Sequence, residues 1–149
     1  MGLFDKLFGK SKPEPASSEA SREPAKLLIQ YFQAMKLHCG ERHFSPNSAT
    51  KDTLAIYFLG GVRALEIEYN LSPSQVANKS VLYLSKFFKY DPNTCWAMAG
   101  LLDPDKTDQA SSLSLIIQRG MDDFRRWREY RDGYADFDFA EIKSYIRGK

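Results

Sequence analysis

The longest apolar stretch of the chain runs from Thr53 to Tyr69 and reads TLAIYFLGGVRALEIEY. Every residue from Leu54 to Leu59 is apolar, and the pair Gly60-Gly61 lies at its middle. On a helix, one face of this stretch follows the i, i+4, i+7, i+8 spacing of an apolar stripe. The residues of that face are Leu54, Phe58, Gly61, Val62, Leu65 and Tyr69. The flanks are apolar too, which is typical of a helix at the middle of a bundle.

The same stretch can also be interpreted as a β-hairpin, with the strands LAIYFL and VRALEIEY on either side of a Gly-Gly turn. A lone two-stranded hairpin is marginally stable, and no other segment offers convincing strands to pair with it. The helix costs about 1 kcal/mol for each glycine relative to alanine. That cost is tolerated where a second helix must approach closely, across a flat patch of Gly60, Gly61 and Ala64. We therefore predict a helix over 53–69.

A first helix is predicted to begin at Pro24, since proline is favoured in the first turn, and to end near His43. Its expected buried stripe consists of Leu28, Tyr31, Phe32, Met35 and Cys39. The loop FSPNSATKD follows, and either Ser48 or Thr50 is expected to cap the central helix.

The segment NLSPSQ after Tyr69 is the clearest local signal in the chain. Ser72 as N-cap, Pro73 in the first turn and Gln75 three residues after the cap form a capping box, so a helix is predicted from Pro73 to about Tyr90. Its expected core face is Val76, Ala77, Val81, Leu84, Phe87 and Phe88. In the short apolar helix NTCWAMAGLL, Trp96 and Leu101 are expected to close one end of the core.

The last long helix is predicted over 108–132. Its expected buried stripe is Leu113, Ile116, Ile117, Gly120, Phe124 and Trp127. Its expected solvent side is densely charged and includes Asp122, Asp123, Arg125, Arg126, Arg128, Glu129, Arg131 and Asp132. The spacing predicts surface ion pairs between Asp122 and Arg126 and between Arg128 and Asp132. A short final helix is expected to follow, begun by Asp138 and Glu141 at capping-box spacing, with Phe139, Ile142 and Ile146 facing inward.

The first ten residues, MGLFDKLFGK, predict a short amphipathic helix whose apolar side is Leu3, Phe4, Leu7 and Phe8. So short a helix forms only against another surface, which would be a partner protein or second copy, its own domain, or a membrane interface. Myristoylation of Gly2 is not expected, because Lys6 stands where the motif needs Ser or Thr. Residues 11–24, rich in Pro, Ser, Glu and Ala, are predicted to be a flexible linker.

The composition, 43% hydrophobic with 13% aromatic residues, is sufficient for a packed core and excludes global disorder. We therefore expect an all-α protein: a single compact bundle of about five helices around 53–69, preceded by the linker and the amphipathic helix. The predicted division is 1–10 amphipathic helix, 11–24 linker and 25–149 helical domain.

A net charge of +2 is too small to indicate nucleic acid by itself. A stripe of Lys79, Tyr83, Lys86 and Tyr90 recurs at helical spacing, and together with Arg125 and Arg128 it is a candidate exposed contact face. Such a stripe is more often a boundary face, with aromatic rings half-buried and lysine heads in water. The acids among the arginines of 119–131 favour a protein partner over nucleic acid.

The chain has two cysteines, Cys39 and Cys95, and shows no secretory signal and no apolar run long enough to span a bilayer. We therefore predict a cytoplasmic protein in which both thiols are reduced. His38, Cys39 and His43, even with Cys95, match no zinc-ligand spacing, so we expect no metal there. Asp103, Asp105 and Asp108 lack the glycine and glutamate of an EF-hand, and a helix cap at Asp108 explains them better.

Catalytic signatures are missing as well: Gly60-Gly61 lacks the rest of a phosphate loop, and neither histidine is placed to activate a nucleophile. We therefore expect no enzyme and no cofactor. The interpretation that fits best is a small cytosolic protein that binds another protein stoichiometrically, as an adaptor or as an inhibitor of the immunity type. The alternatives are a peripheral membrane protein anchored by residues 3–8 and a nucleic-acid-binding protein.

Overall fold

The computed structural model describes residues 15–103, 112–131 and 137–147. Over these ranges the backbone forms six α-helices, two short 3-10 helices and no strand, which confirms the predicted all-α class. The elements are α2 (Pro15–Cys39), η1 (Glu41–Phe44), α3 (Lys51–Tyr69), α4 (Pro73–Phe88), α5 (Pro92–Ala99), η2 (Gly100–Leu102), α6 (Ser112–Arg131) and α7 (Ala140–Arg147). The predicted amphipathic helix over 1–10 lies outside the described residues.

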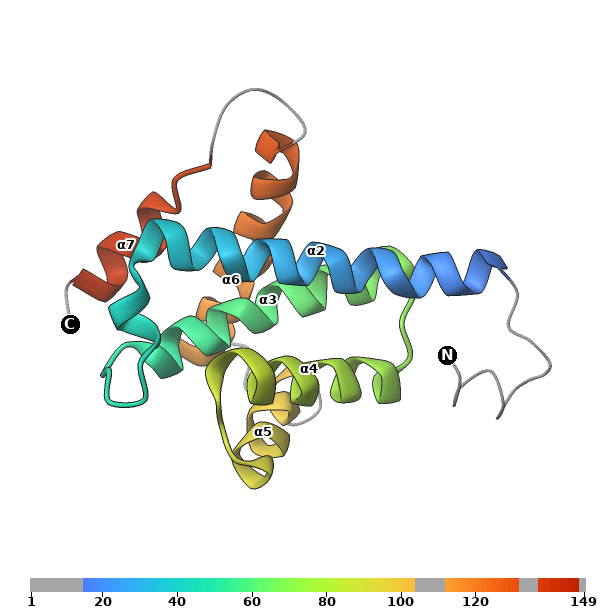
Figure 1. Cartoon of the computed structure of the whole chain (residues 1–149), viewed down its shortest axis with the longest axis horizontal. Coiled ribbons are helices and arrows are strands. Elements are labelled where there is room, and N and C mark those ends of the chain that lie inside the picture. Colours follow the sequence, from blue (N-terminus) through green and yellow to red (C-terminus); the bar gives the residue numbers. More distant parts are fainter. Residues whose placement is uncertain (1–14, 104–111, 132–136, 148–149) are drawn as a thin grey trace.

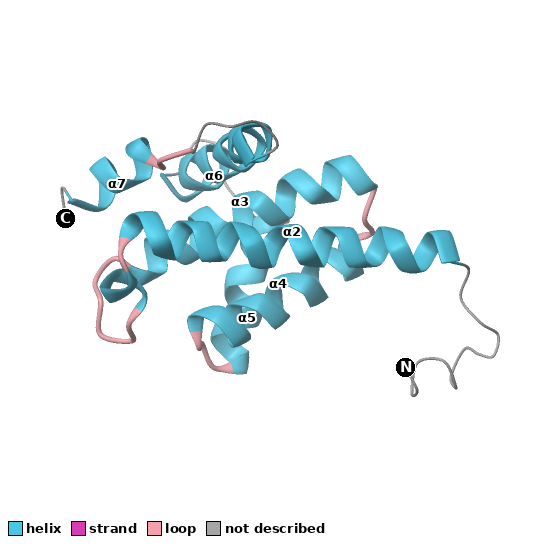
Figure 2. Ribbon diagram, turned by 45° about the horizontal axis from the view of Figure 1, so that its top comes forward, coloured by secondary structure: helices cyan, strands magenta, loops and turns pink. Residues whose placement is uncertain are grey.

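Helix α3 occupies the centre of the bundle, as the apolar pattern predicted (Figure 1). Every residue from Leu54 to Val62 is buried, so the helix has no solvent side over more than two turns. In Figure 2, α6 lies above α3 and α4 below it, with α2 running along the front. The helical interpretation of 53–69 is thus confirmed over the hairpin.

Gly60 of α3 provides a helix crossing, and its partner at that crossing is Gly120 of α6, whereas Gly61 leaves room for the rings of Tyr31 and Phe124. A Cβ atom on Gly120 would lie 2.8 Å from the carbonyl carbon of Tyr57, and one on Gly60 would lie 2.6 Å from the carbonyl carbon of Gly120. These atoms belong to the backbone and cannot rotate away, so the two helices meet main chain to main chain. The predicted close approach across Gly60 is confirmed.

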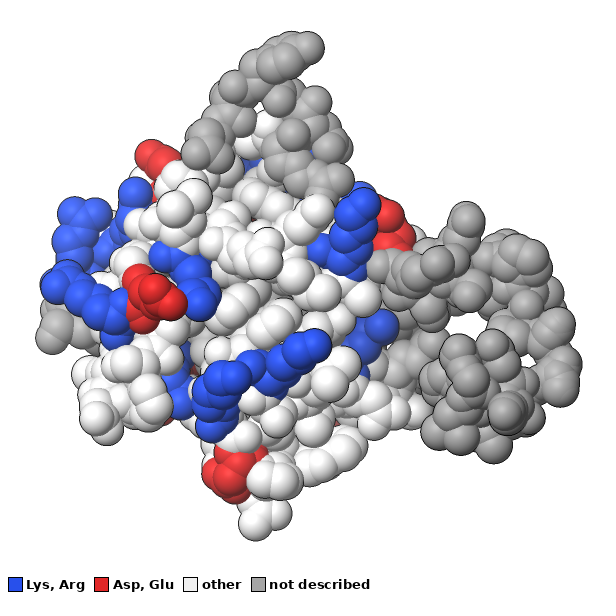
Figure 3. All heavy atoms as spheres, viewed as in Figure 1, with Lys and Arg blue, Asp and Glu red and all other residues white. Residues whose placement is uncertain are grey.

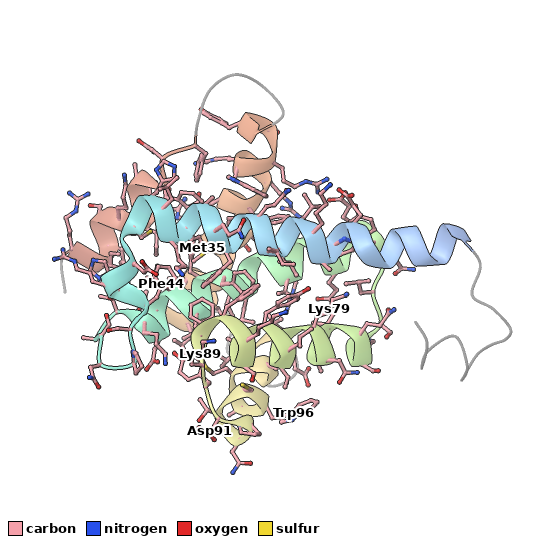
Figure 4. All side chains as sticks on the ribbon, viewed as in Figure 1. Met35, Phe44, Lys79, Lys89, Asp91 and Trp96 are labelled. Carbon is pink, nitrogen blue, oxygen red and sulfur yellow. The ribbon has the colours of Figure 1, made fainter. Side chains whose placement is uncertain are left out.

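Rings fill the space between α2, α3 and α6. Tyr31 lies at the centre of this cluster, edge-on to Phe124 with ring centroids 4.9 Å apart and tilted against Trp127 at 5.3 Å. On the other side of α2, Phe32 stacks on Phe87 at 4.3 Å. Met35 and Phe44 point into the same interior in Figure 4, and both are buried.

Helix α2 begins at Pro15, well before the predicted start at Pro24, which lies inside the helix. The predicted linker over 11–24 is therefore wrong from Pro15 onward, and its first residues lie outside the described ranges. Pro15 is suited to a first helical turn, and the alanines, Glu19, Arg22 and Glu23 that follow are compatible with a helix. At its other end α2 stops at Cys39 rather than near His43, because Gly40 at φ 101° turns the chain into η1.

The cap of α4 matches the prediction in both of its hydrogen bonds. The backbone N–H of Gln75 donates to Ser72 Oγ at 3.2 Å, and the backbone N–H of Ser72 donates to Gln75 Oε1 at 2.8 Å. At the start of α3, Thr50 is the N-cap residue, but its side chain makes no capping bond and instead contacts His43 Nδ1 at 2.8 Å. The loop is thereby tied to η1.

Trp96 does not close the core. It is 52% exposed and projects away from the bundle in Figure 4, whereas its neighbour Cys95 is fully buried. In the short helix α5, Cys95 and Ala99 are one turn apart and face inward, so Trp96 is rotated by about 100° away from them. Leu101 is half-buried, and Leu102 takes the buried position at that end.

Candidate protein-binding cleft

Helices α6 and α7 enclose a surface cleft of about 500 Å³. Its lining is mixed, because Ser112 and Ser144 contribute polar groups beside the apolar and charged side chains. The residues that define it are Leu115, Ile116 and Arg119 from α6 and Glu141, Ile142 and Tyr145 from α7. Phe139, Ile142 and Ile146 of the C-terminal segment are buried as predicted, and Phe139 packs against Tyr31 of α2 with ring centroids 5.9 Å apart.

The rim of the cleft carries large apolar side chains in contact with solvent. Leu115 is 62% exposed and Tyr145 is 43% exposed. Leu113, which does not line the cleft, is also exposed on α6. Leu113 was predicted to belong to the buried stripe of α6. That stripe begins one turn later, at the half-buried Ile116 and buried Ile117, because α3 contacts α6 around Gly120 and not near its start.

An ion pair bridges the two walls, with Arg119 Nη1 at 2.5 Å from Glu141 Oε1. Both side chains are substantially exposed, so the pair contributes at most about 1 kcal/mol to stability. Its main effect is to hold a cation and a carboxylate beside the apolar side chains of the cleft. The surface therefore offers an incoming group apolar contact in the centre and hydrogen-bonding partners beside it.

Beneath this pair lies a carboxylate that was predicted to face solvent. Asp123 is only 1% exposed, and its Oδ2 accepts a 2.6 Å hydrogen bond from the hydroxyl of Tyr57. Burial raises the pKa of Asp123, and the nearby charge of Glu141 raises it further, while the Tyr57 hydrogen bond and the cations Arg119 and Arg126 oppose the shift. Burial also raises the pKa of Tyr57 far above its ordinary value, so this phenol is always the donor.

The predicted ion pair Asp122–Arg126 does not occur among the described residues, and the predicted pair Arg128–Asp132 involves a residue outside them. Asp122 accepts a hydrogen bond from Gln118, and Arg128 pairs with Glu68 of α3. Arg126 is 4.0 Å from Asp123. Asp132 lies outside the described residues. Long arginine side chains on α6 reach acids on the neighbouring helix, which i, i+4 spacing along one helix does not reveal.

The predicted contact stripe of α4 is not a continuous exposed face. Tyr83 is buried and stacks on Phe87 at 5.1 Å, so it belongs to the core. Tyr90 is half-buried, with Lys51 4.1 Å above its ring and its hydroxyl donating to Asp52. Lys86 is exposed, while Lys79 is half-buried and its pKa is lowered by that burial.

The arginines predicted to join that stripe lie on α6, on the other side of α3 from α4 (Figure 2). Arg125 is exposed, and Arg128 is held by Glu68. The structure therefore does not bring the two groups together. The other predicted contact residues, Leu3, Phe4, Leu7 and Phe8, lie outside the described residues and remain a prediction.

The cleft residues were not singled out from the sequence, although a signal existed. Leu115 and Tyr145 are large apolar residues that fall off the buried stripes of their helices, next to Ile116 and Ile146. An apolar side chain off the stripe is a sign of a contact surface when a second one lies beside it. That proximity depends on how α7 packs on α6, which spacing along the chain does not contain.

Within the described ranges, no group of three or more His, Cys, Asp or Glu side chains is arranged to hold a metal ion. His38 and Cys39 are half-buried, and His43 contacts Thr50. Burial raises the pKa of the Cys39 thiol to about 11, against the opposing charge of Lys143, so this cysteine is protonated near neutral pH and is a poor nucleophile.

The described helices include none that is long and apolar enough to cross a membrane.

Comparison with protein families gives one match: residues 22–147 match the family model described as immunity protein 48. The match includes all of α3 to α7 and therefore both walls of the cleft. Searches of curated proteins and of solved structures found no match.

Proposed function

The chain belongs to the immunity protein 48 family, and we propose on that basis that it binds a cognate toxin protein and inhibits it by stoichiometric association. The family match over residues 22–147 is the observation that carries this proposal. Proteins of immunity families are typically non-enzymatic inhibitors. The protonated Cys39 thiol and the apolar character of the cleft agree with a role in binding.

We propose the α6–α7 cleft as the surface that contacts the toxin. Leu115 and Tyr145 are exposed at this cleft, and burying their apolar surface on association would release water from it. Tyrosine is also enriched among the residues that dominate binding energy. Burial of a leucine side chain contributes about 1.5–3 kcal/mol, so Leu115 and Tyr145 together would supply a substantial part of the affinity. Arg119 and Glu141 would supply polar contacts at the rim, where charge determines specificity more than strength.

The experiment that tests the proposed function is a titration of toxin activity against the molar ratio of the two proteins. The toxin is first isolated by its co-purification with the tagged full-length chain and then purified alone. We expect its toxicity to fall linearly as the chain is added and to vanish at one equivalent, because each chain occupies one toxin molecule.

Two other results would contradict the proposal. Loss of toxicity at far below one equivalent would mean that each chain inactivates many toxin molecules, as an enzyme does. Toxicity that persists at a large excess of a folded chain would mean that the chain does not inhibit that protein.

A further inference from the structure

A second depression lies at the opposite edge of α7 from the cleft, where the end of α2, η1 and α7 meet. Its volume is about 220 Å³. We call it the basic recess, and it is lined by His38, Cys39, Arg42, His43, Lys143 and Arg147, with Ile146 at its base. In Figure 3, lysine and arginine atoms gather at this end of the molecule, on the left of the view.

The lining of the recess is strongly biased in charge. Arg42, Lys143 and Arg147 are cations at neutral pH, and none of the described lining residues is a carboxylate. The acid nearest in sequence, Glu41, lies 3.3 Å from Lys36 and does not line the recess. Three cations around a small depression make a local positive potential that a molecule of net charge +2 would not otherwise have.

The fold fixes the backbone that carries these groups, while the side chains of Arg42 and Arg147 extend into solvent. Gly40, at φ 101°, reverses the chain at the end of α2 so that η1 brings Arg42 and His43 beside α7. His43 Nδ1 is 2.8 Å from Thr50 Oγ1, which in turn is 2.8 Å from Ser48 Oγ. From the other side, the buried Ile142 and Ile146 fix α7. A site assembled in advance loses little conformational entropy when a ligand binds.

The recess and the cleft share one short helix. Ile142 and Tyr145 line the cleft, whereas Lys143 and Arg147 line the recess. An α7 of eight residues is about 12 Å long, and a standard interface covers about 800 Å² on each partner. A protein seated on the cleft reaches the recess only if its interface extends around the end of α7, and such an interface is part of this proposal.

We propose that the basic recess binds an aspartate or glutamate side chain from an acidic segment of the cognate toxin and so forms a charged subsite beside the apolar cleft. This inference rests on the proposed function. A carboxylate fits because arginine and lysine donors are its strongest hydrogen-bonding partners, and the described lining of the recess contains no acid to neutralise them. A nucleic-acid strand would need cations along a path of several phosphates, whereas these converge on one small depression.

The first test uses the isotopically labelled full-length chain alone, titrated with hexaglutamate and followed by its backbone amide signals in NMR spectra. We expect the largest shifts at Arg42, Lys143 and Arg147. They should be lost in the double variant Arg42→Glu/Arg147→Glu and kept in Lys86→Glu, which reverses an exposed charge on α4. Arg42 and Arg147 are both exposed, so the bundle should fold in the variant, and Arg42→Ala/Arg147→Ala repeats the test without introducing acids.

Shifts centred elsewhere, or shifts that survive in both double variants, would contradict the subsite. A single-stranded oligonucleotide of the same charge is titrated in parallel. If it binds the recess more tightly than hexaglutamate at equal salt, the recess takes phosphates and the proposed carboxylate partner is wrong.

The second test measures association of the purified toxin by stopped flow at several salt concentrations. The Arg42→Glu/Arg147→Glu variant should associate about 10-fold more slowly at low salt, with a weaker salt dependence, while Lys86→Glu stays near wild type. An unchanged rate in the double variant would contradict the subsite alone. A wild-type chain that binds hexaglutamate at the recess but does not bind the toxin would contradict the proposed function instead.

Discussion

Asp123 and Tyr57 show how one buried polar contact affects the stability of this fold. The carboxylate is almost completely removed from solvent and accepts a hydrogen bond from the Tyr57 hydroxyl, while its other oxygen has no hydrogen-bond partner in the described part of the chain. A buried carboxylate with an unsatisfied oxygen favours its protonated form, which is why its pKa is raised.

Replacement of Asp123 by asparagine should therefore change the pH dependence of stability. In the folded protein the pKa of Asp123 lies above its ordinary value of 3.8, so the folded protein keeps the Asp123 proton to a higher pH than the unfolded chain does. The stability of the wild type therefore decreases as pH rises from the unfolded pKa of Asp123 to its folded pKa. The introduced amide would keep an acceptor for Tyr57 and would not titrate. We expect the stability of Asp123→Asn relative to wild type to increase as pH rises above about 4 and then to level off.

The measurement is urea unfolding of wild type and Asp123→Asn at a series of pH values, with Asp122→Asn as the matched control. Asp122 is the neighbouring acid and accepts a hydrogen bond from Gln118 on the outside of α6. A difference between Asp123→Asn and wild type that does not vary with pH would show that Asp123 is not an unfavourably buried carboxylate.

The burial of Asp123 could be predicted from the sequence only in part. Position 123 is three residues after Gly120 and four before Trp127, so the helical period places it next to the buried stripe. We expected it on the charged side because its neighbours there are charged. Its true environment depends on Tyr57, which is far away in the chain and is brought close only by the crossing of α3 and α6.

At the scale of elements, that crossing is the contact on which the bundle most depends. Gly120→Ala should reduce the free energy of unfolding by at least about 3 kcal/mol, because the added Cβ meets the main chain of Tyr57, which cannot move without separating the helices. Thermal or chemical unfolding followed by circular dichroism measures this change.

Gly100→Ala is the control for the glycine prediction. A Cβ atom on Gly100 would meet nothing within 4 Å, so the substitution should be close to neutral. Equal effects of the two substitutions would show that the backbone contact at Gly120 is not what limits the packing of α6 on α3.

The capping box of α4 gives a smaller and local effect. Ser72→Ala removes the acceptor for the Gln75 amide and should lower stability by about 1 kcal/mol, while Ser74→Ala, in the same turn and exposed, should cost much less. Urea unfolding of the two variants provides the comparison. If Ser74→Ala costs as much as Ser72→Ala, the cap does not contribute as proposed.

Elements were predictable where the signal is local. The apolar run of α3 and the Ser72 cap of α4 correctly predicted both helices, since burial on all sides and a capping box each indicate a helix without tertiary information. The start of α2 was placed too late because Pro24 resembles a first-turn proline. Pro24 lies inside α2, where a proline costs about 3 kcal/mol relative to alanine. The sequence shows no interaction that would offset this cost, so a helix start at Pro24 was the expected choice.

At the scale of the whole molecule, the proposed function depends on how α7 packs against the rest of the bundle. This short helix forms one wall of the apolar cleft and one wall of the basic recess. The sequence indicated a protein-binding role from composition and from the lack of catalytic motifs. It could not locate the cleft, because Leu115 and Tyr145 become neighbours only when α7 docks on α6.

The measurement that tests the central claim most directly is calorimetric titration of the purified toxin with Leu115→Asp and with Leu82→Asp. Both are exposed leucines on helices, Leu115 on the cleft and Leu82, 52% exposed, on α4. If the toxin occupies the cleft, Leu115→Asp should weaken binding by roughly 30-fold or more, equivalent to about 2 kcal/mol, while Leu82→Asp binds like wild type. Wild-type affinity of a folded Leu115→Asp chain, or loss of binding in Leu82→Asp instead, would contradict the placement of the toxin on the α6–α7 cleft.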